Sequence, residues 1–289
     1  MPICRFQLHA TESRMTRLGW LDLEQERVYE LSETIGNLLS MSAEERIQRL
    51  AALRRSAVAA YPLSTLVLRA PVDDQEIWAA GVTYEQSRDA RMEESGHDDL
   101  YLQVYNADRP ELFMKASGWR CVGHGQAVGI RADSSWDVPE PELTLVVDSA
   151  GEIAGYTIGN DVSSRSIEGE NALYLPQAKM YYASCALGPW IMLSEELPEA
   201  RNLPISMTIT RDEEPIWTGK TNTNRLRRSY EELIDHLFRG LDFPSGVFLM
   251  TGTGLVPPPE YTLETGDEIT IDIEGIGTLR NRAIRLEAR

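Results

Sequence analysis

Apolar residues follow a strand-like pattern in several short segments of the second half of the chain. In DEITIDIEGIGTLRN, at 267–281, three isoleucines recur at every second position before two glycines that favour a turn. The apolar run LTLVVD, at 143–148, is followed by turn-forming residues over 148–151 and by a second run, IAGYTIGND, at 153–161. The pattern predicts β-strands, and the last two segments predict a β-hairpin.

Two other segments have a helical pattern with a capping residue at the start. SAEERIQRLAALRRSAVAAYP begins with Ser42 and carries Glu45 three positions later, which is the spacing of a capping box. Pro62 ends this pattern. The apolar positions expected on its buried face are Ile47, Leu50, Ala51 and Leu53. SYEELIDHLFRG, at 229–240, begins with a serine in the same way and ends with glycine, so it predicts a second helix.

Clusters of strands with only a few helices indicate an α+β fold rather than a regular βαβ repeat. The beginning of the chain differs from the rest, because short strand-like pieces precede the first predicted helix there. We therefore predict a small N-terminal α/β domain over residues 1–70 and a larger domain over 71–289.

The composition limits the classes of partner. Apolar residues make up 42% of the chain and charged residues 25%, as in soluble globular proteins, but the formal net charge is −17. So acidic a chain repels nucleic acid and anionic membranes, and no run of Lys or Arg forms a basic stripe. A small anionic substrate fits only where a metal or a local basic cluster reverses the field.

The compartment can also be predicted. No window approaches the ~18 apolar residues of a membrane span, and MPICRFQLHATESR lacks the apolar core of a signal peptide. The three cysteines, Cys4, Cys121 and Cys185, share no CxxC spacing, so we expect reduced thiols. These features predict a cytoplasmic protein.

Acidic residues cluster at one end of the predicted hairpin. Glu140 and Glu142 stand one residue apart in WDVPEPELTLVVD and therefore point to the same face of a strand. A turn at 148–151 places Glu140 opposite roughly residue 159, within a residue or two of Asp161. Three carboxylates that converge repel one another, and a divalent cation removes the repulsion. Oxygen ligands alone favour Mg²⁺, Mn²⁺ or Ca²⁺ over zinc. A solvated sheet edge is the alternative interpretation.

Further residues resemble a known family. EPELTLVVDSAGEIAGYTIGNDVSSRSIEGENALYLPQAKMYYASCALGPWI and MTGTGLVPPPEYTLETGDEITIDIEGIGTLRN resemble the fumarylacetoacetate hydrolase superfamily over roughly residues 75–285. The resemblance implies a catalytic domain with a mixed β-roll. It also implies one Mg²⁺ or Mn²⁺ bound by Glu140, Glu142 and Asp161, an active-site Lys179, and a TGT loop at 251–253.

The chain departs from this family in one motif. The family's C–C hydrolases usually carry NYxxHxxE, whose His and Glu activate water, whereas GVTYEQSRDA keeps only the tyrosine, Tyr84. Ser87 and Ala90 stand where the His and Glu would be, and neither is a general base at neutral pH. None of the four histidines is an obvious replacement; these are His9, His97, His124 and His236.

SRDARMEES, RPELFMKASG and YLPQAK resemble the 2-keto-3-deoxy-sugar-acid dehydratase branch of the family. The resemblance implies that Mg²⁺ stabilises an enolate while a hydroxyl leaves as water, as in the conversion of a 2-keto-3-deoxypentonate to 2-oxoglutarate semialdehyde. It offers Glu111 and Lys179 as the catalytic pair. The expected substrate contacts are Tyr84, Ser87, Arg88, Lys115 and Thr253.

The resemblance also implies a small anionic 2-keto acid as substrate and a homodimer or homotetramer as the assembly. Two alternatives stay open. The same scaffold could cleave or decarboxylate a 2,4-diketo acid and release pyruvate, because a metal site alone does not select the reaction. The chain could also be a metal-binding or interaction protein without catalytic activity.

Overall fold

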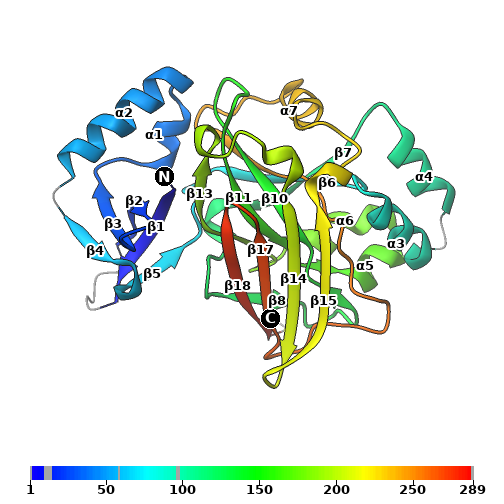
Figure 1. Cartoon of the computed structure of the whole chain (residues 1–289). Helices are drawn as coiled ribbons and strands as arrows, with labels where there is room; N and C mark the ends of the chain where they lie inside the picture. The colour runs from blue at the N-terminus through cyan, green and yellow to red at the C-terminus, as the bar shows by residue number, and fades with distance from the viewer. Residues whose placement is uncertain (1, 10–14, 58, 96–97, 288–289) are drawn as a thin grey trace.

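The computed structural model describes residues 2–9, 15–57, 59–95 and 98–287 (Figure 1). Most strands belong to one mixed sheet, in the order β4 (Ala60–Pro62), β3 (Arg27–Leu31), β2 (Arg17–Asp22), β1 (Ile3–Leu8), β13 (Cys185–Leu193), β11 (Ile153–Asp161), β10 (Pro141–Val147), β16 (Val247–Met250), β6 (Glu76–Gly81) and β7 (Glu111–Ser117), with β5 (Leu66–Arg69) beside β1.

A second sheet contains β15 (Glu214–Asn222), β14 (Pro204–Arg211), β17 (Glu268–Ile273), β18 (Gly277–Arg285) and β8 (Ala127–Ile130), and a short ladder joins β9 (Asp137–Val138) to β12 (Ser163–Ser164). The α-helices are α1 (Ile35–Leu39), α2 (Ala43–Ser56), α3 (Glu85–Ser95), α4 (Asp98–Asn106), α5 (Arg165–Glu170), α6 (Leu175–Lys179) and α7 (Tyr230–Phe238). The predicted α+β class is confirmed. No helix among the described residues is long and apolar enough to cross a membrane.

The two predicted helices are confirmed as α2 and α7. Ser42 and Glu45 form the capping box of α2, and the Ser229 hydroxyl accepts the first-turn N–H of Glu232 in α7. The prediction for Ile47 is wrong, because its side chain is 48% exposed. The buried face of α2 consists instead of Arg46, Leu50 and Leu53. These positions have helical spacing, but the first of them is a charged residue.

The hairpin of β10 and β11 lies in the middle of the large sheet. Leu143, Leu145 and Val147 of β10 pack in the same core as the three isoleucines of β17, so one face of the hairpin is covered by the second sheet. Val146 points to the opposite face and packs with Phe248 and Leu39. Both faces of the strand are therefore dry, and every residue of β10 is buried.

The register of this hairpin differs from the prediction by two residues. Pro141 pairs with Asn160 and Glu142 pairs with Gly159, so the numbers of opposing residues sum to 301 rather than about 299. The ladder shifts between Val146 and Val147, near the turn, which accounts for part of the difference. The backbone N–H of Asp161 consequently donates to the carbonyl oxygen of Glu140 at 2.9 Å, and the two acidic residues lie directly across from each other.

The helices α1 and α2 are joined to the turn of this hairpin. Arg46 of α2 places a guanidinium nitrogen 2.9 Å from Asp148, and both side chains are almost fully buried. The other oxygen of Asp148 accepts the N–H groups of Ala150 and Glu152, and the Ser149 N–H donates to Leu39. The end of the hairpin remote from the acidic cluster is thus anchored by α1 and α2.

We expect Arg46→Met to lower the free energy of unfolding by about 3–5 kcal/mol, because it leaves the buried Asp148 carboxylate without its counter-charge. Denaturant titration measures this change. Arg55→Met removes an exposed arginine from the same helix and should change stability by less than about 0.5 kcal/mol. An equal, small effect of the two substitutions would contradict the role given to Arg46.

Candidate active site

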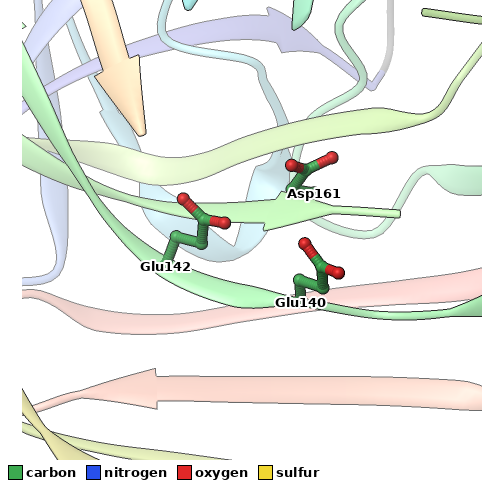
Figure 2. Close-up of side chains that lie close together, drawn as sticks. All are labelled: Glu140, Glu142 and Asp161. Atoms are coloured by element: carbon green, nitrogen blue, oxygen red, sulfur yellow. The ribbon is translucent and has the colours of Figure 1, made fainter. Parts of the chain in front are cut away.

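Three carboxylates meet at one end of the β10–β11 hairpin (Figure 2). Glu140 precedes β10, Glu142 is its second residue, and Asp161 ends β11. One oxygen from each lies within 4.8 Å of the others, and the three residues are at most 4% exposed. The predicted convergence is therefore confirmed. A solvated sheet edge is ruled out for these side chains because water scarcely reaches them.

Three buried cations surround the carboxylates. The Lys179 ammonium, at the end of α6, lies 2.7 Å from Glu140 and 3.1 Å from Asp161. The Lys115 ammonium lies 2.5 Å from the other Asp161 oxygen and also donates to the carbonyl oxygens of Val162 and Lys179. Arg165 donates to Glu140 at 2.5 Å. Each cation relieves part of the repulsion among the acids.

Three buried residues of this cluster were not predicted from the sequence, namely Arg165, Ser163 and Glu168. Ser163 accepts a hydrogen bond from the Lys179 ammonium at 2.5 Å. Glu168 lies 3.8 Å from Arg165 and 4.0 Å from Lys179, and it is 2% exposed. A sequence signal existed, since Arg165 and Glu168 are three residues apart, shortly after the strand that ends in Asp161. That spacing puts both side chains on one face of a helix.

The TGT loop holds the second metal-ligand candidate in place. The N–H of Gly252 donates to Glu142 at 2.6 Å, and Thr251 bonds the carbonyl oxygen of Leu143 through both its N–H and its hydroxyl. Gly252 has φ +94°, and a Cβ there would lie 1.9 Å from the Thr83 hydroxyl oxygen. Only glycine fits this position. The loop therefore contributes a backbone donor to Glu142.

The residues present fit a divalent cation. Burial raises the pKa of Glu142 well above its usual range, and the nearby charges of Asp161 and Glu140 raise it further. The ionised form of a carboxylate in this environment is stabilised when a cation binds in place of the proton. The donors are all oxygens, as Mg²⁺ and Mn²⁺ prefer.

A small cavity opens onto the carboxylates, and its walls include several predicted residues. Ser87 and Thr253 line it together with Lys179, Arg165 and Phe113. The hydroxyl of Ser87 donates to the carbonyl oxygen of Tyr84 at 2.9 Å.

Glu111 begins β7 and pairs with Gly81, which lines the same cavity. The space that a Cβ of Gly81 would fill is taken by the Glu111 carboxylate, 2.1 Å from that position. The Glu111 carboxylate therefore lies against a residue of the cavity wall, although Glu111 is not itself one of the described lining residues.

Three other predicted contact residues do not line the cavity. Lys115 lies behind Asp161 with no exposed surface. Arg88 pairs with Asp89 at 2.6 Å and lies over the ring of Tyr105. Tyr84 is fully buried, and the pKa of its phenol is raised by burial and by the nearby Tyr230 and Glu142.

Of the residues that the structure describes, none of those lining the cavity is a histidine. His124 donates from Nδ1 to the Thr278 carbonyl oxygen, and His236 donates to the Glu232 carbonyl oxygen within α7. His9 directly follows β1, and His97 lies outside the described residues. Ser87, which stands where the family's histidine would be, is buried on the cavity wall. The described lining therefore has no His–Glu dyad that could activate water.

Comparison with known proteins places this geometry in a family. The model of the fumarylacetoacetate (FAA) hydrolase C-terminal domain matches residues 76–284. The chain belongs to the fumarylacetoacetate hydrolase family. The mixed sheets and the acidic cluster are those expected of a member of this family, as the resemblance in the sequence predicted.

Two curated relatives are similar over most of the chain. One is a probable 2-keto-3-deoxyxylonate dehydratase of Haloferax volcanii, 54% identical over 211 residues, or 73% of each chain. Another is a 2-dehydro-3-deoxy-D-arabinonate dehydratase of Saccharolobus solfataricus, 43% identical over 229 residues, or 78% of this chain and 77% of that one. A solved 2-keto-3-deoxy-D-arabinonate dehydratase complexed with magnesium and 2,5-dioxopentanoate has a TM-score of 0.83 and 34% identity over the full length of both chains.

Glu142→Gln should weaken Mg²⁺ binding by at least about 100-fold, since the loss of a supporting residue near a metal already costs about 10–100-fold. Isothermal titration calorimetry measures the affinity. Glu152→Gln, which removes an exposed carboxylate near the turn of the same hairpin, is the matched control and should leave the affinity unchanged. Unaltered binding by the Glu142 variant would show that the ion is held elsewhere.

The affinity of the wild-type protein for Mg²⁺ should rise with pH, because a proton on Glu142 competes with the ion. The pKa of Glu142 is raised, so the proton is held to a higher pH than on an ordinary glutamate. Below that raised pKa, we expect up to about a tenfold gain in affinity for each pH unit. Calorimetry across a pH series measures the slope, and an affinity that falls as pH rises would contradict this account.

Proposed function

We propose that this protein is a Mg²⁺-dependent dehydratase of 2-keto-3-deoxy sugar acids, which converts a 2-keto-3-deoxypentonate to 2-oxoglutarate semialdehyde, also called 2,5-dioxopentanoate. The observation that carries the proposal is the buried acidic cluster beside a lysine, in a cavity whose described lining has no water-activating dyad. Similarity to dehydratases in sequence and in fold supports the same reaction. Pyruvate-releasing C–C hydrolysis is not favoured.

Glu140, Glu142 and Asp161 would hold the ion. A bound Mg²⁺ would supply Lewis acidity at the 2-keto acid group, which would make the adjacent C3 proton more acidic. The chain itself must then remove that proton, balance the negative charge that appears on the keto oxygen, and protonate the departing C4 hydroxyl. Water leaves without an attacking nucleophile, so the reaction needs no activated water. The 2-oxo-3-ene that remains carries a 5-hydroxyl, and proton shifts through its conjugated system give the terminal aldehyde of 2,5-dioxopentanoate.

Lys179 is suited to balance charge. Its three close partners, Glu140, Asp161 and Ser163, all accept hydrogen bonds, and an ammonium has three N–H donors to match them. A protonated amine therefore matches the three acceptors around it. We assign it the role of stabilising negative charge on the substrate, in a site where the low dielectric strengthens the attraction.

Glu111 is suited to move the proton. Its carboxylate lies against Gly81, which is a residue of the cavity wall, and the described cavity lining offers no histidine for this role. We assign to Glu111 both the removal of the C3 proton and its delivery to the C4 hydroxyl. Ser87 and Thr253 line the cavity and are the proposed contacts for substrate hydroxyls.

The remaining predicted contacts receive other roles. Lys115 holds Asp161 from behind and is proposed as a positioning residue. Tyr84 supports the wall of the site near Glu142, and Arg88 packs on α4. A direct substrate contact for these three stays a prediction, because none of them lines the cavity in this structure.

We also propose a cytoplasmic homodimer or homotetramer, in which residues 1–70 form an accessory domain. The free thiols of all three cysteines support the compartment. Large exposed apolar side chains support an assembly, among them Trp119, Leu173 and Tyr182, at 71%, 84% and 62% exposure. Light scattering of the purified protein tests the assembly.

Glu111→Gln should lower kcat by about 10²–10⁴, the usual contribution of a positioned proton-transfer group, and should leave the substrate bound. Lys179→Met should lower kcat as strongly and should also raise KM, because it removes a charge that attracts the substrate. Glu214→Gln, on the exposed surface of β15, is the control and should match the wild type. Proton NMR follows the loss of the 2-keto-3-deoxypentonate and identifies the product.

The same assay separates the two reactions of this scaffold. The dehydratase yields 2,5-dioxopentanoate in the presence of Mg²⁺. Rapid release of pyruvate from a 2,4-diketo acid, together with no reaction of the 3-deoxy acid, would show that another group activates water and that the proposed function is wrong.

A further inference from the structure

Glu168 is a buried acid that is not one of the candidate metal ligands. It lies on α5, is 2% exposed, and is close to the two cations that contact Glu140. Glu140, Glu142 and Asp161 are needed to hold a cation, whereas the proposed reaction gives Glu168 no role. Burying a carboxylate costs several kcal/mol unless nearby charges repay it, so its presence here calls for a reason.

The net charge of the buried cluster provides a reason for the burial of Glu168. The four acids are Glu140, Glu142, Asp161 and Glu168, and the three cations are Lys115, Arg165 and Lys179, all at most 4% exposed. With all four acids ionised, as ion binding requires of Glu142, the four negative and three positive charges sum to −1, and the Glu111 carboxylate beside the same cavity adds one more negative charge. A divalent cation then leaves the site without net charge.

A metal-loaded site without net charge takes up one negative charge at a lower cost than two. A dianion would leave two unbalanced negative charges in a place that water scarcely reaches, and such charges are costly. Without Glu168 the metal-loaded site would carry +1, which would lower the cost of the second charge of a dianion.

We propose that Glu168 is a specificity-determining residue, which sets the charge of the metal-loaded site so that monoanionic 2-keto acids bind in preference to dianionic ones. This inference rests on the proposed function, because a 2-keto-3-deoxy sugar acid carries a single carboxylate. The position of Glu168 suits this role, since it adds negative charge beside Arg165 and Lys179 without being one of the three ligand candidates.

Two small chelating anions test the inference without turnover. Pyruvate is a monoanion and oxalate is a dianion at neutral pH, and both offer adjacent oxygens. Calorimetry with the Mg²⁺-loaded protein gives both dissociation constants and their ratio. In Glu168→Gln, the ratio should shift toward oxalate by roughly tenfold, which is the effect of one unit charge at an effective dielectric constant of about 20.

Two variants separate charge from shape. Glu168→Asp keeps the charge and should keep the wild-type ratio, whereas a merely structural role would disturb the Asp and Gln variants alike. Glu170→Gln removes an exposed carboxylate from the same helix and should also keep the wild-type ratio. A folded Glu168→Gln protein with an unchanged ratio, or an Asp variant that shifts as far as the Gln variant, would overturn the inference.

A third variant covers the case in which Glu168→Gln does not fold. Arg165→Gln lowers the charge of the cluster by one, so it should shift the ratio toward pyruvate, and a shift toward oxalate would overturn the inference. Failure of the proposed function is distinguishable. A wild-type protein that does not dehydrate 3-deoxy acids contradicts the function, whereas the ratio of the two dissociation constants tests Glu168 by itself.

Discussion

Electrostatic repulsion among buried carboxylates is the constraint on which this structure depends. Glu140, Glu142 and Asp161 share a space from which water is almost excluded, and burial together with their mutual repulsion raises the pKa of Glu142. Lys115, Arg165 and Lys179 offset part of this cost, and a divalent cation offsets the rest. The repulsion that destabilises the three carboxylates without an ion therefore favours the binding of a divalent cation.

The fold holds the acids in this position from both ends of one hairpin. At the acidic end, the Gly252 N–H fixes the Glu142 carboxylate, and the Asp161 backbone is bonded to Glu140. At the turn, Arg46 of the N-terminal segment binds Asp148. Because β10 is buried on both faces, it has little freedom to relax away from the repulsion. The N-terminal strands and helices thus support the site although they contribute no ligand candidate.

Much of this could be predicted from the sequence because it follows from local periodicity. The strand alternation placed Glu140 and Glu142 on one face, and the hairpin brought Asp161 to them. The register was two residues off, and a shift near the turn, which has no clear sequence signal, accounts for part of that difference. Ile47 was misplaced because burial of Arg46 depends on Asp148, which is 102 residues away.

The surroundings of the acids were harder to predict. Whether Lys115 faces the cavity or Asp161 depends on tertiary packing, and no periodicity encodes it. Arg165 and Glu168 had a usable signal in their spacing, yet their meaning depends on the charges that the fold brings around them. The family resemblance predicted the ligand candidates, but it did not predict the balance of buried negative and positive charges around them.

Anomalous diffraction from crystals soaked in Mn²⁺ tests the central claim most directly. The account predicts one strong anomalous peak bounded by oxygens of Glu140, Glu142 and Asp161, at about 2.0–2.3 Å from each, as hard divalent cations require. Lys179 and Arg165 should stay beside the ion-binding carboxylates. A well-occupied peak elsewhere, with these three side chains free of metal, would contradict the account.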